Sequence, residues 1–167
     1  MNHKSSFKFS YMPHPFVIRS IVENDFNQWK ILWDGYNQFY GRKGSTALSP
    51  EITRATWSRF FELNEPVNAL VAEGTAGLLG LAHFIYHRST IQIGLSCYMQ
   101  DLFTTTEARG KGVGSALIHE VYKRALAHRS PRVYWQTHES NLTAMKLYDK
   151  VAEKSGFVVY RKTLNQS

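Results

Sequence analysis

Gly110, Gly112 and Gly114 alternate with other residues in a pattern that could bind a phosphate group. The cations Arg109 and Lys111 stand among them, and a helix-forming run follows. Glycine lets the backbone approach a ligand closely and adopt a positive φ. The first amides of a helix lack intrahelical partners and carry the positive end of its dipole, so a pyrophosphate fits there. The alternative is a strand-to-helix turn whose glycines only allow tight packing.

The spacing separates this loop from two common nucleotide-binding motifs. A dinucleotide fingerprint requires G-x-G-x-x-G, and a P-loop requires G-x-x-x-x-G-K-[ST]. Here the pattern is G-x-G-x-G, and position 115 is serine. The loop also follows about two thirds of the chain rather than the first strand of a doubly wound unit. We therefore expect neither NAD nor ATP.

Strands and helices that position this loop follow from the hydrophobic periodicity. Helices are expected over 23–41, from Ser49-Pro50-Glu51 onward, over 112–128 and over 140–156, with strands at 16–21, 67–74, 77–88, 97–105, 132–138 and 157–164. The strand–helix–strand unit around the loop requires a right-handed crossover between parallel strands. The expected class is α/β (α+β): a mixed, mostly antiparallel twisted sheet with a central parallel β-α-β unit and helices on both faces.

Composition indicates one globular domain, with residues 1–15 as a flexible arm and residues 16–167 as the domain. Cys97 is the only cysteine, so an internal disulfide is excluded, and no apolar run approaches the length of a membrane span or a signal peptide. These features indicate the cytoplasm. The net charge is +7, but the basic residues are scattered, which disfavours nucleic acid as a partner.

The motifs together resemble the GNAT N-acetyltransferases, whose signature is R/Q-x-x-G-x-G/A. The segment Arg109-Gly-Lys-Gly-Val-Gly114 matches this signature. The resemblance continues through residues 134–141 and 144–157, which look like the yeast histone-and-polyamine acetyltransferase subgroup and its bacterial relatives. It is strong over 67–164 and weaker over 16–66.

The resemblance implies acetyl-coenzyme A as co-substrate and no metal. The strand before the loop would pair its backbone with the pantetheine arm, and the loop amides would hold the pyrophosphate. Arg109 contacts phosphate or fixes the turn. The cofactor-binding residues are expected to be Leu102, Phe103, Thr104, Arg109, Gly110, Lys111, Gly112, Val113, Gly114, Ser115 and Asn141.

The resemblance also implies direct acyl transfer to a primary amine, with Tyr148 as the acid that protonates the leaving thiolate. Asn141 and Tyr148 are seven residues apart, about 10 Å along one helix face; the alternative is that Tyr148 is a core aromatic. The base is less defined, because Gln100 occupies a position where polyamine acetyltransferases often have a carboxylate. We expect a water relay that ends at Asp101 or Glu139. Strand alternation places Asp101 on the face opposite Gln100, and a structural role for Asp101 stays open.

The acceptor is expected over the first two helices, where Tyr36 and Tyr40 could cradle an ammonium group or simply pack the helix on the sheet. Polyamines, a lysine side chain of a basic protein and small amino compounds are the expected acceptor classes. The rival reading is a non-catalytic acyl-CoA-binding sensor or scaffold. The resemblance further implies a homodimer that assembles through the C-terminal region, where the last strand would otherwise leave an open edge.

Overall fold

The computed structural model describes residues 15–164, so the expected N-terminal arm lies almost entirely outside the described residues. The chain forms two compact units, Met1–Trp135 and Gln136–Ser167. Each unit is described by itself. Within residues 15–164, no helix has the length and hydrophobicity that crossing a bilayer requires.

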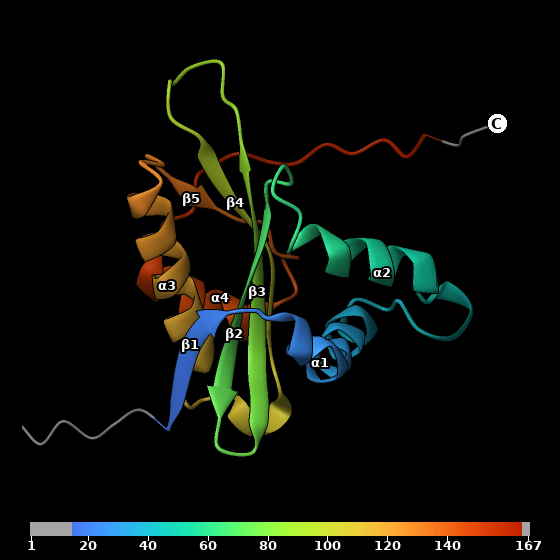
Figure 1. Cartoon of the computed structure of the whole chain (residues 1–167). Helices are drawn as coiled ribbons and strands as arrows, with labels where there is room; N and C mark the ends of the chain where they lie inside the picture. Colours follow the sequence, from blue (N-terminus) through green and yellow to red (C-terminus); the bar gives the residue numbers. More distant parts are fainter. Residues whose placement is uncertain (1–14, 165–167) are drawn as a thin grey trace, which may run out of the picture. The chain divides into compact units, whose positions relative to one another are not determined.

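A five-stranded sheet forms the centre of the first unit (Figure 1). Its strands follow one another in chain order: β1 (Phe16–Ser20), β2 (Val67–Gly74), β3 (Gly77–His87), β4 (Ser96–Thr104) and β5 (Val133–Tyr134). The first four strands pair antiparallel, whereas β5 pairs parallel with β4. The mixed, mostly antiparallel sheet with one parallel β-α-β unit is therefore confirmed.

Helices cover both faces of this sheet (Figure 1). On one face α1 (Phe26–Phe39) contacts β3 and β4, and α2 (Pro50–Arg59) lies beside it. On the other face α3 (Val113–Ala127) crosses from β4 to β5. The predicted start of α2 is confirmed, because Ser49 is its N-cap and accepts a hydrogen bond from the Ile52 amide. The helix α4 (Leu142–Val151) belongs to the second unit.

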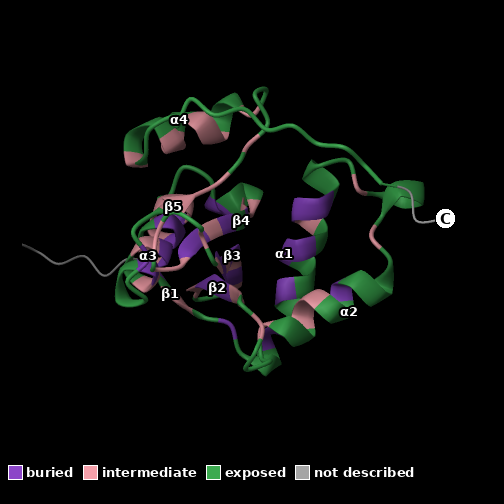
Figure 2. Ribbon diagram, turned by 90° about the horizontal axis from the view of Figure 1, so that it is seen from above, coloured by how far each residue is buried: buried purple, intermediate pink, exposed green. Residues whose placement is uncertain are grey.

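An aromatic core joins α1 to the sheet, and Figure 2 shows buried residues on both α1 and the sheet. Trp29 is fully buried, and its ring stacks on Trp33 at 5.8 Å between centroids. Trp57 and Phe60 bring the α2 region onto the same cluster. Because aromatic side chains bury more apolar area than any other type, this cluster fixes how α1 and α2 lie against β3 and β4.

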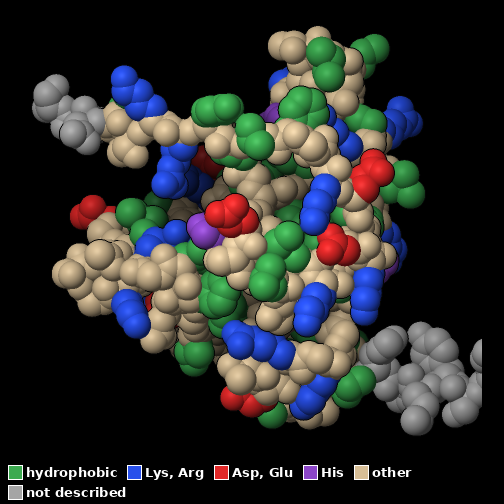
Figure 3. All heavy atoms as spheres, turned by 180° about the vertical axis from the view of Figure 1, so that it is seen from behind, with side chains coloured by type: hydrophobic (Ala, Val, Ile, Leu, Met, Phe, Trp, Pro, Cys, Tyr) green, Lys and Arg blue, Asp and Glu red, His purple; other side chains and the backbone are tan. Residues whose placement is uncertain are grey.

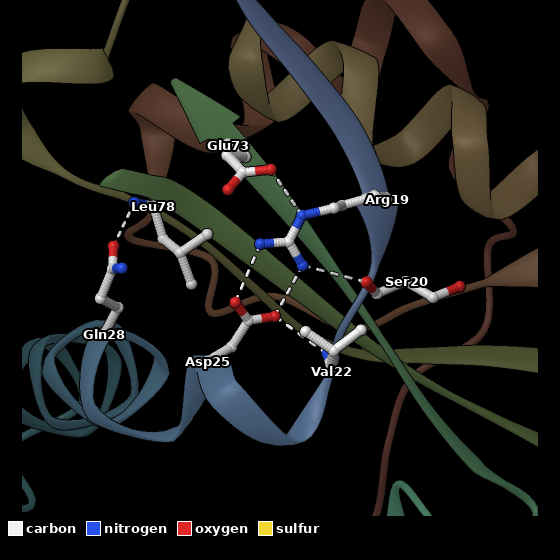
Figure 4. A network of polar contacts seen from close by, with 7 residues as sticks. All are labelled: Arg19, Ser20, Val22, Asp25, Gln28, Glu73 and Leu78. Atoms are coloured by element: carbon white, nitrogen blue, oxygen red, sulfur yellow. Dashed lines mark hydrogen bonds and ion pairs between the residues drawn. The ribbon is translucent and has the colours of Figure 1, made fainter. Parts of the chain in front are cut away.

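An ionic network fixes the entry into α1 (Figure 4). The Arg19 guanidinium donates to both carboxylate oxygens of Asp25 at 2.6 and 2.8 Å, and its Nε donates to Glu73 at 2.6 Å. Asp25 also accepts from the Val22 amide at 2.9 Å. Hydrogen bonds from Arg19 lower the pKa of both Asp25 and Glu73. Glu73 thus lies in a structural ion pair.

Three expected elements differ from the structure near the C-terminus. The predicted strand over 132–138 is reduced to two residues, because β4 bulges at Gln100 and its pairing with β5 ends at Tyr98. The predicted helix over 140–156 ends at Val151, and the exposed residues after it bury nothing that would extend a helix. The predicted strand over 157–164 is wrong: this exposed segment has no partner strand among the described residues.

Candidate active site

The backbone of the glycine loop has the features that a pyrophosphate site requires. Gly110 and Gly112 have φ values of +74° and +83°, and a Cβ added to either would meet nothing within 4 Å. Gly112 is the N-cap of α3, and no side chain caps this helix start. The first amides of α3 therefore have no intrahelical partner. Within the loop before α3, the Arg109 amide donates to the Thr106 carbonyl and the Lys111 amide to the Ala108 carbonyl, each at 3.3 Å.

The strand before this loop has one edge available for an extended ligand. Leu102, Phe103 and Thr104 pair with β3 on one side. On the other side, the pairing with β5 stops at Tyr98, and no other strand of the described sheet replaces it. An extended chain can add to such an edge through main-chain hydrogen bonds. This geometry fits the pantetheine arm that the sequence predicts for these three residues.

A β-bulge at Gln100 changes the direction of the side chain that follows it. His83 pairs with Asp101 and Phe84 pairs with Met99, so Gln100 is the extra residue in β4. Gln100 and Asp101 consequently line the same cavity. The expectation that Asp101 lies on the face opposite Gln100 was wrong, because a bulge interrupts strand alternation.

Asp101 is held by two buried side chains in series. The Trp29 indole N–H donates to His83 Nε2 at 3.0 Å. An Nε2 that accepts leaves the ring proton on Nδ1, which donates to Asp101 Oδ2 at 3.0 Å. Asp101 is 5% exposed and His83 is 2% exposed. The imidazole thus has one defined tautomer, and it orients the carboxylate.

Two tyrosines complete the surroundings of Asp101. Burial raises the pKa of Tyr36, and the Asp101 carboxylate raises it further by charge and by hydrogen bonding. Burial raises the pKa of Tyr98 as well, with a smaller contribution from Asp101. Both phenols therefore remain protonated at neutral pH, so they can donate to a nearby carboxylate and do not compete with it as bases.

A cavity of about 90 Å³ opens beside Asp101. It lies among α1, α2 and the strands β2 to β4. Its lining combines charged, polar and apolar side chains: Trp33, Thr56, Arg59, Val67, His83, Ile85, Gln100 and Asp101. Since Asp101 directly precedes the predicted pantetheine segment, the cavity adjoins the part of β4 where an acyl group would arrive.

A second cavity of about 130 Å³ is larger but has a different setting. It is lined by residues of β1 to β3 and by Arg124 and His128 near the C-terminal end of α3. None of the sequence-predicted site residues lines it. The C-terminal end of a helix also disfavours an anionic ligand. The cavity beside Asp101 is therefore the better candidate for the active site.

The two predicted acceptor residues already contact a cation of the chain itself. The Arg42 guanidinium lies over the rings of Tyr36 and Tyr40, 5.5 Å from each centroid. Tyr36 is buried, whereas Tyr40 is 39% exposed. Because Arg42 covers the ring of Tyr36, this residue contributes to the site through its hydrogen bond with Asp101 and not through an open ring face. The role of Tyr40 in acceptor binding stays a prediction.

Three predicted site residues belong to the second unit. Asn141 is the N-cap of α4, and its side-chain amide donates a hydrogen bond to the Thr137 hydroxyl at 3.1 Å. Tyr148 lies within α4, and the exposed Glu139 precedes the helix. Their assignments to cofactor binding, to the acid and to the water relay stay predictions.

Sequence reasoning missed His83, Trp29 and Arg59 as members of the site. His83 stands inside the apolar strand expected over 77–88. Its useful signal was a histidine inside an apolar strand, because a buried imidazole needs partners for both nitrogens. Trp29 and Arg59 carried no separate signal, since only the packing of α1 and α2 brings them here.

Comparison with known proteins identifies the family. Residues 29–152 match the acetyltransferase (GNAT) family. The chain is 35% identical over 148 residues to D-amino-acid N-acetyltransferase HPA3 of Saccharomyces cerevisiae, a match that covers 87% of this chain and 89% of that protein. The chain therefore belongs to the GNAT family and is an N-acetyltransferase.

Solved structures share the fold at lower identity. A ribosomal-protein-alanine N-acetyltransferase from Brucella melitensis biovar Abortus 2308 has a TM-score of 0.73 and 18% identity, covering 90% of this chain and 100% of that one. The protein AAC(6')-Iy, solved with the bisubstrate analogue CoA-S-monomethyl-acetylneamine, has a TM-score of 0.75 and 13% identity, covering 90% of this chain and 99% of that one. At these identities the likeness concerns the fold alone.

Proposed function

We propose that this protein transfers the acetyl group of acetyl-coenzyme A to the primary amine of a small amino compound, with Asp101 receiving the proton of the amine directly or through water. The observation that carries this proposal is the buried carboxylate of Asp101, oriented by His83 and lining a cavity beside β4. Residues 16–167 act in this proposal as one acetyltransferase domain, in line with the family match over 29–152.

Different residues serve the separate steps of acyl transfer in this proposal. Acetyl-coenzyme A supplies the acetyl group as a thioester. The open backbone at Gly110 and Gly112 and the free edge at Leu102 to Thr104 support its binding. An ammonium group must lose a proton before it can attack, and a fixed carboxylate beside the acceptor serves that step. Tyr148 is proposed to protonate the departing thiolate, and Asn141 to contact the cofactor.

Amino acids are the first acceptor class in this proposal, because the relative HPA3 is named a D-amino-acid N-acetyltransferase. Polyamines and lysine side chains are the other classes. The net charge of +7 disfavours a polycationic acceptor. We further propose a cytoplasmic homodimer, supported by the single buried Cys97 and by the exposed apolar side chains after residue 156.

The test measures free coenzyme A released from acetyl-coenzyme A with D- and L-amino acids, polyamines, aminoglycosides and histone-tail peptides. At least one amine should give turnover. Asp101→Asn should then lower kcat/KM about 100-fold or more. The matched control is Asp34→Asn, which removes an exposed carboxylate of α1 that pairs with Lys30. Coenzyme A binding checks that both variants remain folded.

Two outcomes would contradict the proposal. Full activity of Asp101→Asn would exclude this residue as the base. Coenzyme A binding without thiol release for any acceptor would instead favour the acyl-CoA-binding sensor. Tyr148→Phe adds a further distinction, because an enzyme loses rate while a sensor keeps its affinity.

A further inference from the structure

We infer that the cavity beside Asp101 selects an acceptor that carries a carboxylate next to its amine, with Asp101 facing the ammonium group and Arg59 and Trp33 binding the carboxylate. The inference rests on the proposed function and names the features of the acceptor that this site recognises. It begins from a cavity that has one acidic and one basic side chain in its lining, in addition to His83. A zwitterionic amino acid complements both charges at once.

Arg59 has a guanidinium group that is available to a ligand. It is the last residue of α2, and its side chain is 52% exposed. The carboxylate paired with it is Glu65, whose Oε1 lies 3.9 Å from the Arg59 Nε. That distance is too long for a hydrogen bond. Because a guanidinium binds a carboxylate through two parallel hydrogen bonds, a substrate carboxylate offers Arg59 a better partner than Glu65 does.

Trp33 supplies an independent observation. Its Nε1–H is buried and has no hydrogen-bond partner in the described part of the chain, and Trp33 lines the same cavity. Buried donors are nearly always paired in folded proteins. A carboxylate bound at Arg59 has spare lone pairs for such a donor and for the Thr56 hydroxyl, which also lines the cavity. The unpaired indole therefore points to an anionic group of the ligand.

The remaining lining limits the size and charge of the acceptor. A cavity of about 90 Å³ is small and suits the compact ammonium and carboxylate head of an amino acid. Val67 and Ile85 offer apolar surface for a small side chain. A polyamine brings a second ammonium group instead of a carboxylate, and Arg59 repels it. The site thus favours free amino acids with small side chains over polyamines.

The experiment compares three acceptors that differ only at the carboxylate: alanine, alaninamide and 2-aminopropane, with both enantiomers where they exist. The wild-type protein should use alanine with a kcat/KM at least tenfold above that of alaninamide. Arg59→Met should lower kcat/KM for alanine at least tenfold, mainly through KM, and leave alaninamide within about twofold. These ratios correspond to about 1.4 kcal/mol or more of selective binding.

Three further variants separate charge, geometry and helix stability. Arg59→Lys keeps the charge but loses the two-pronged hydrogen bonding, so it should recover only part of the activity on alanine. Trp33→Phe keeps a ring and removes the donor, and should raise KM for alanine several-fold. Arg54→Met is the matched control, because Arg54 is an exposed arginine of the same helix that does not line the cavity.

The outcomes distinguish this inference from the proposed function. Equal use of alanine and alaninamide, or an equal loss of both in Arg59→Met, would overturn the inference while leaving the acetyltransferase intact. Absence of turnover with every amine would contradict the proposed function. In that case ligand-observed NMR of alanine with coenzyme A present decides: binding to the wild type but not to Arg59→Met supports the carboxylate site, and no binding overturns it.

Discussion

Trp29 reaches the site through its hydrogen bond to His83 and through the stacking of its ring on Trp33. It does not line the cavity, and its indole donor fixes which imidazole nitrogen faces Asp101. Trp29→Phe removes this donor while keeping an aromatic ring. We expect kcat to fall roughly tenfold, equivalent to about 1.4 kcal/mol, with little change in KM for the acceptor.

The control for this prediction is Trp57→Phe. Trp57 belongs to the same aromatic cluster, with its ring centroid 4.8 Å from that of Trp29. Both variants should lose stability by repacking, as thermal unfolding would record. Only Trp29→Phe should change kcat, and similar kinetics in the two variants would show that Trp29 is merely part of the core.

Cys97 should be inert toward thiol reagents in the folded protein. It is fully buried, and burial raises the pKa of its thiol to about 12. Because the thiolate is the reactive form, a disulfide reagent at pH 8 should label no cysteine until the chain is unfolded, when one thiol per chain reacts. Rapid labelling of the native protein would contradict this prediction. An inert Cys97 also leaves the free-thiol assay for coenzyme A without background.

At the scale of elements, the start of α3 depends on a backbone that only glycine adopts easily. Gly112→Ala places a side chain at φ +83°, which costs roughly 1–2 kcal/mol and displaces the amides that face the proposed pyrophosphate. Calorimetry should show weaker coenzyme A binding. Gly44→Ala is the matched control, because Gly44 also has a positive φ of +57° and open space around it. If both variants bind coenzyme A like the wild type, the loop does not hold the phosphates.

The ion pairs between β1 and the start of α1 should give the fold an acid-sensitive component. The folded pKa of Asp25 is lowered by Arg19 from its ordinary 3.8, so its unfolded form binds a proton first as the pH falls. The stabilisation is thus complete above about pH 4 and decreases as the pH falls through the folded pKa. Asp25→Asn should cost roughly 1–3 kcal/mol at pH 7 and flatten the acid dependence of denaturant unfolding. An unchanged slope below pH 4 would contradict this role.

The accuracy of sequence-based prediction depended on whether local pattern alone determined the element. The bounds of β2 were predicted without error, and Ser49-Pro50 located the start of α2. The bulge at Gln100 carries no glycine to mark it, so the direction of Asp101 could not be read from strand alternation. Residues 157–164 have strand-forming side chains, but strand formation also requires a partner, which local sequence does not encode.

In the candidate site, residues that are adjacent in the sequence were predicted, whereas residues that only folding brings together were not. The glycine loop and the segment Leu102 to Thr104 form one contiguous motif, so the sequence located them together. The contact of His83 with Trp29 joins residues 54 positions apart, and Arg59 reaches the cavity only through the packing of α2. The proposed acceptor cavity could not be located from one sequence because its lining residues come from five elements.

At the scale of the whole molecule, the basic residues behind the charge surplus are scattered along the sequence. The face drawn in Figure 3 carries Lys and Arg side chains interspersed with acidic and apolar ones. A protein that binds nucleic acid usually gathers its basic residues in a patch or stripe. The net charge of +7 is therefore better understood as favouring anionic ligands such as coenzyme A in general than as a nucleic-acid site.

The exposed apolar segment near the C-terminus leads to a prediction about assembly. Phe157, Val158, Val159 and Tyr160 are between 65% and 93% exposed. Contiguous apolar residues of strand-forming type rarely stay in water, because they pair with other chains. We expect light scattering with size-exclusion chromatography to give twice the 19.2 kDa of one chain.

A single added charge in this segment tests the assembly. Val159→Lys should weaken the dimer at least tenfold, because a buried lysine without a partner is unfavourable in an apolar interface. Ala152→Lys adds the same charge at an exposed position outside the segment and should leave the dimer intact. A mass of one chain at every concentration of the wild type would exclude the dimer, and equal dissociation in both variants would locate its interface elsewhere.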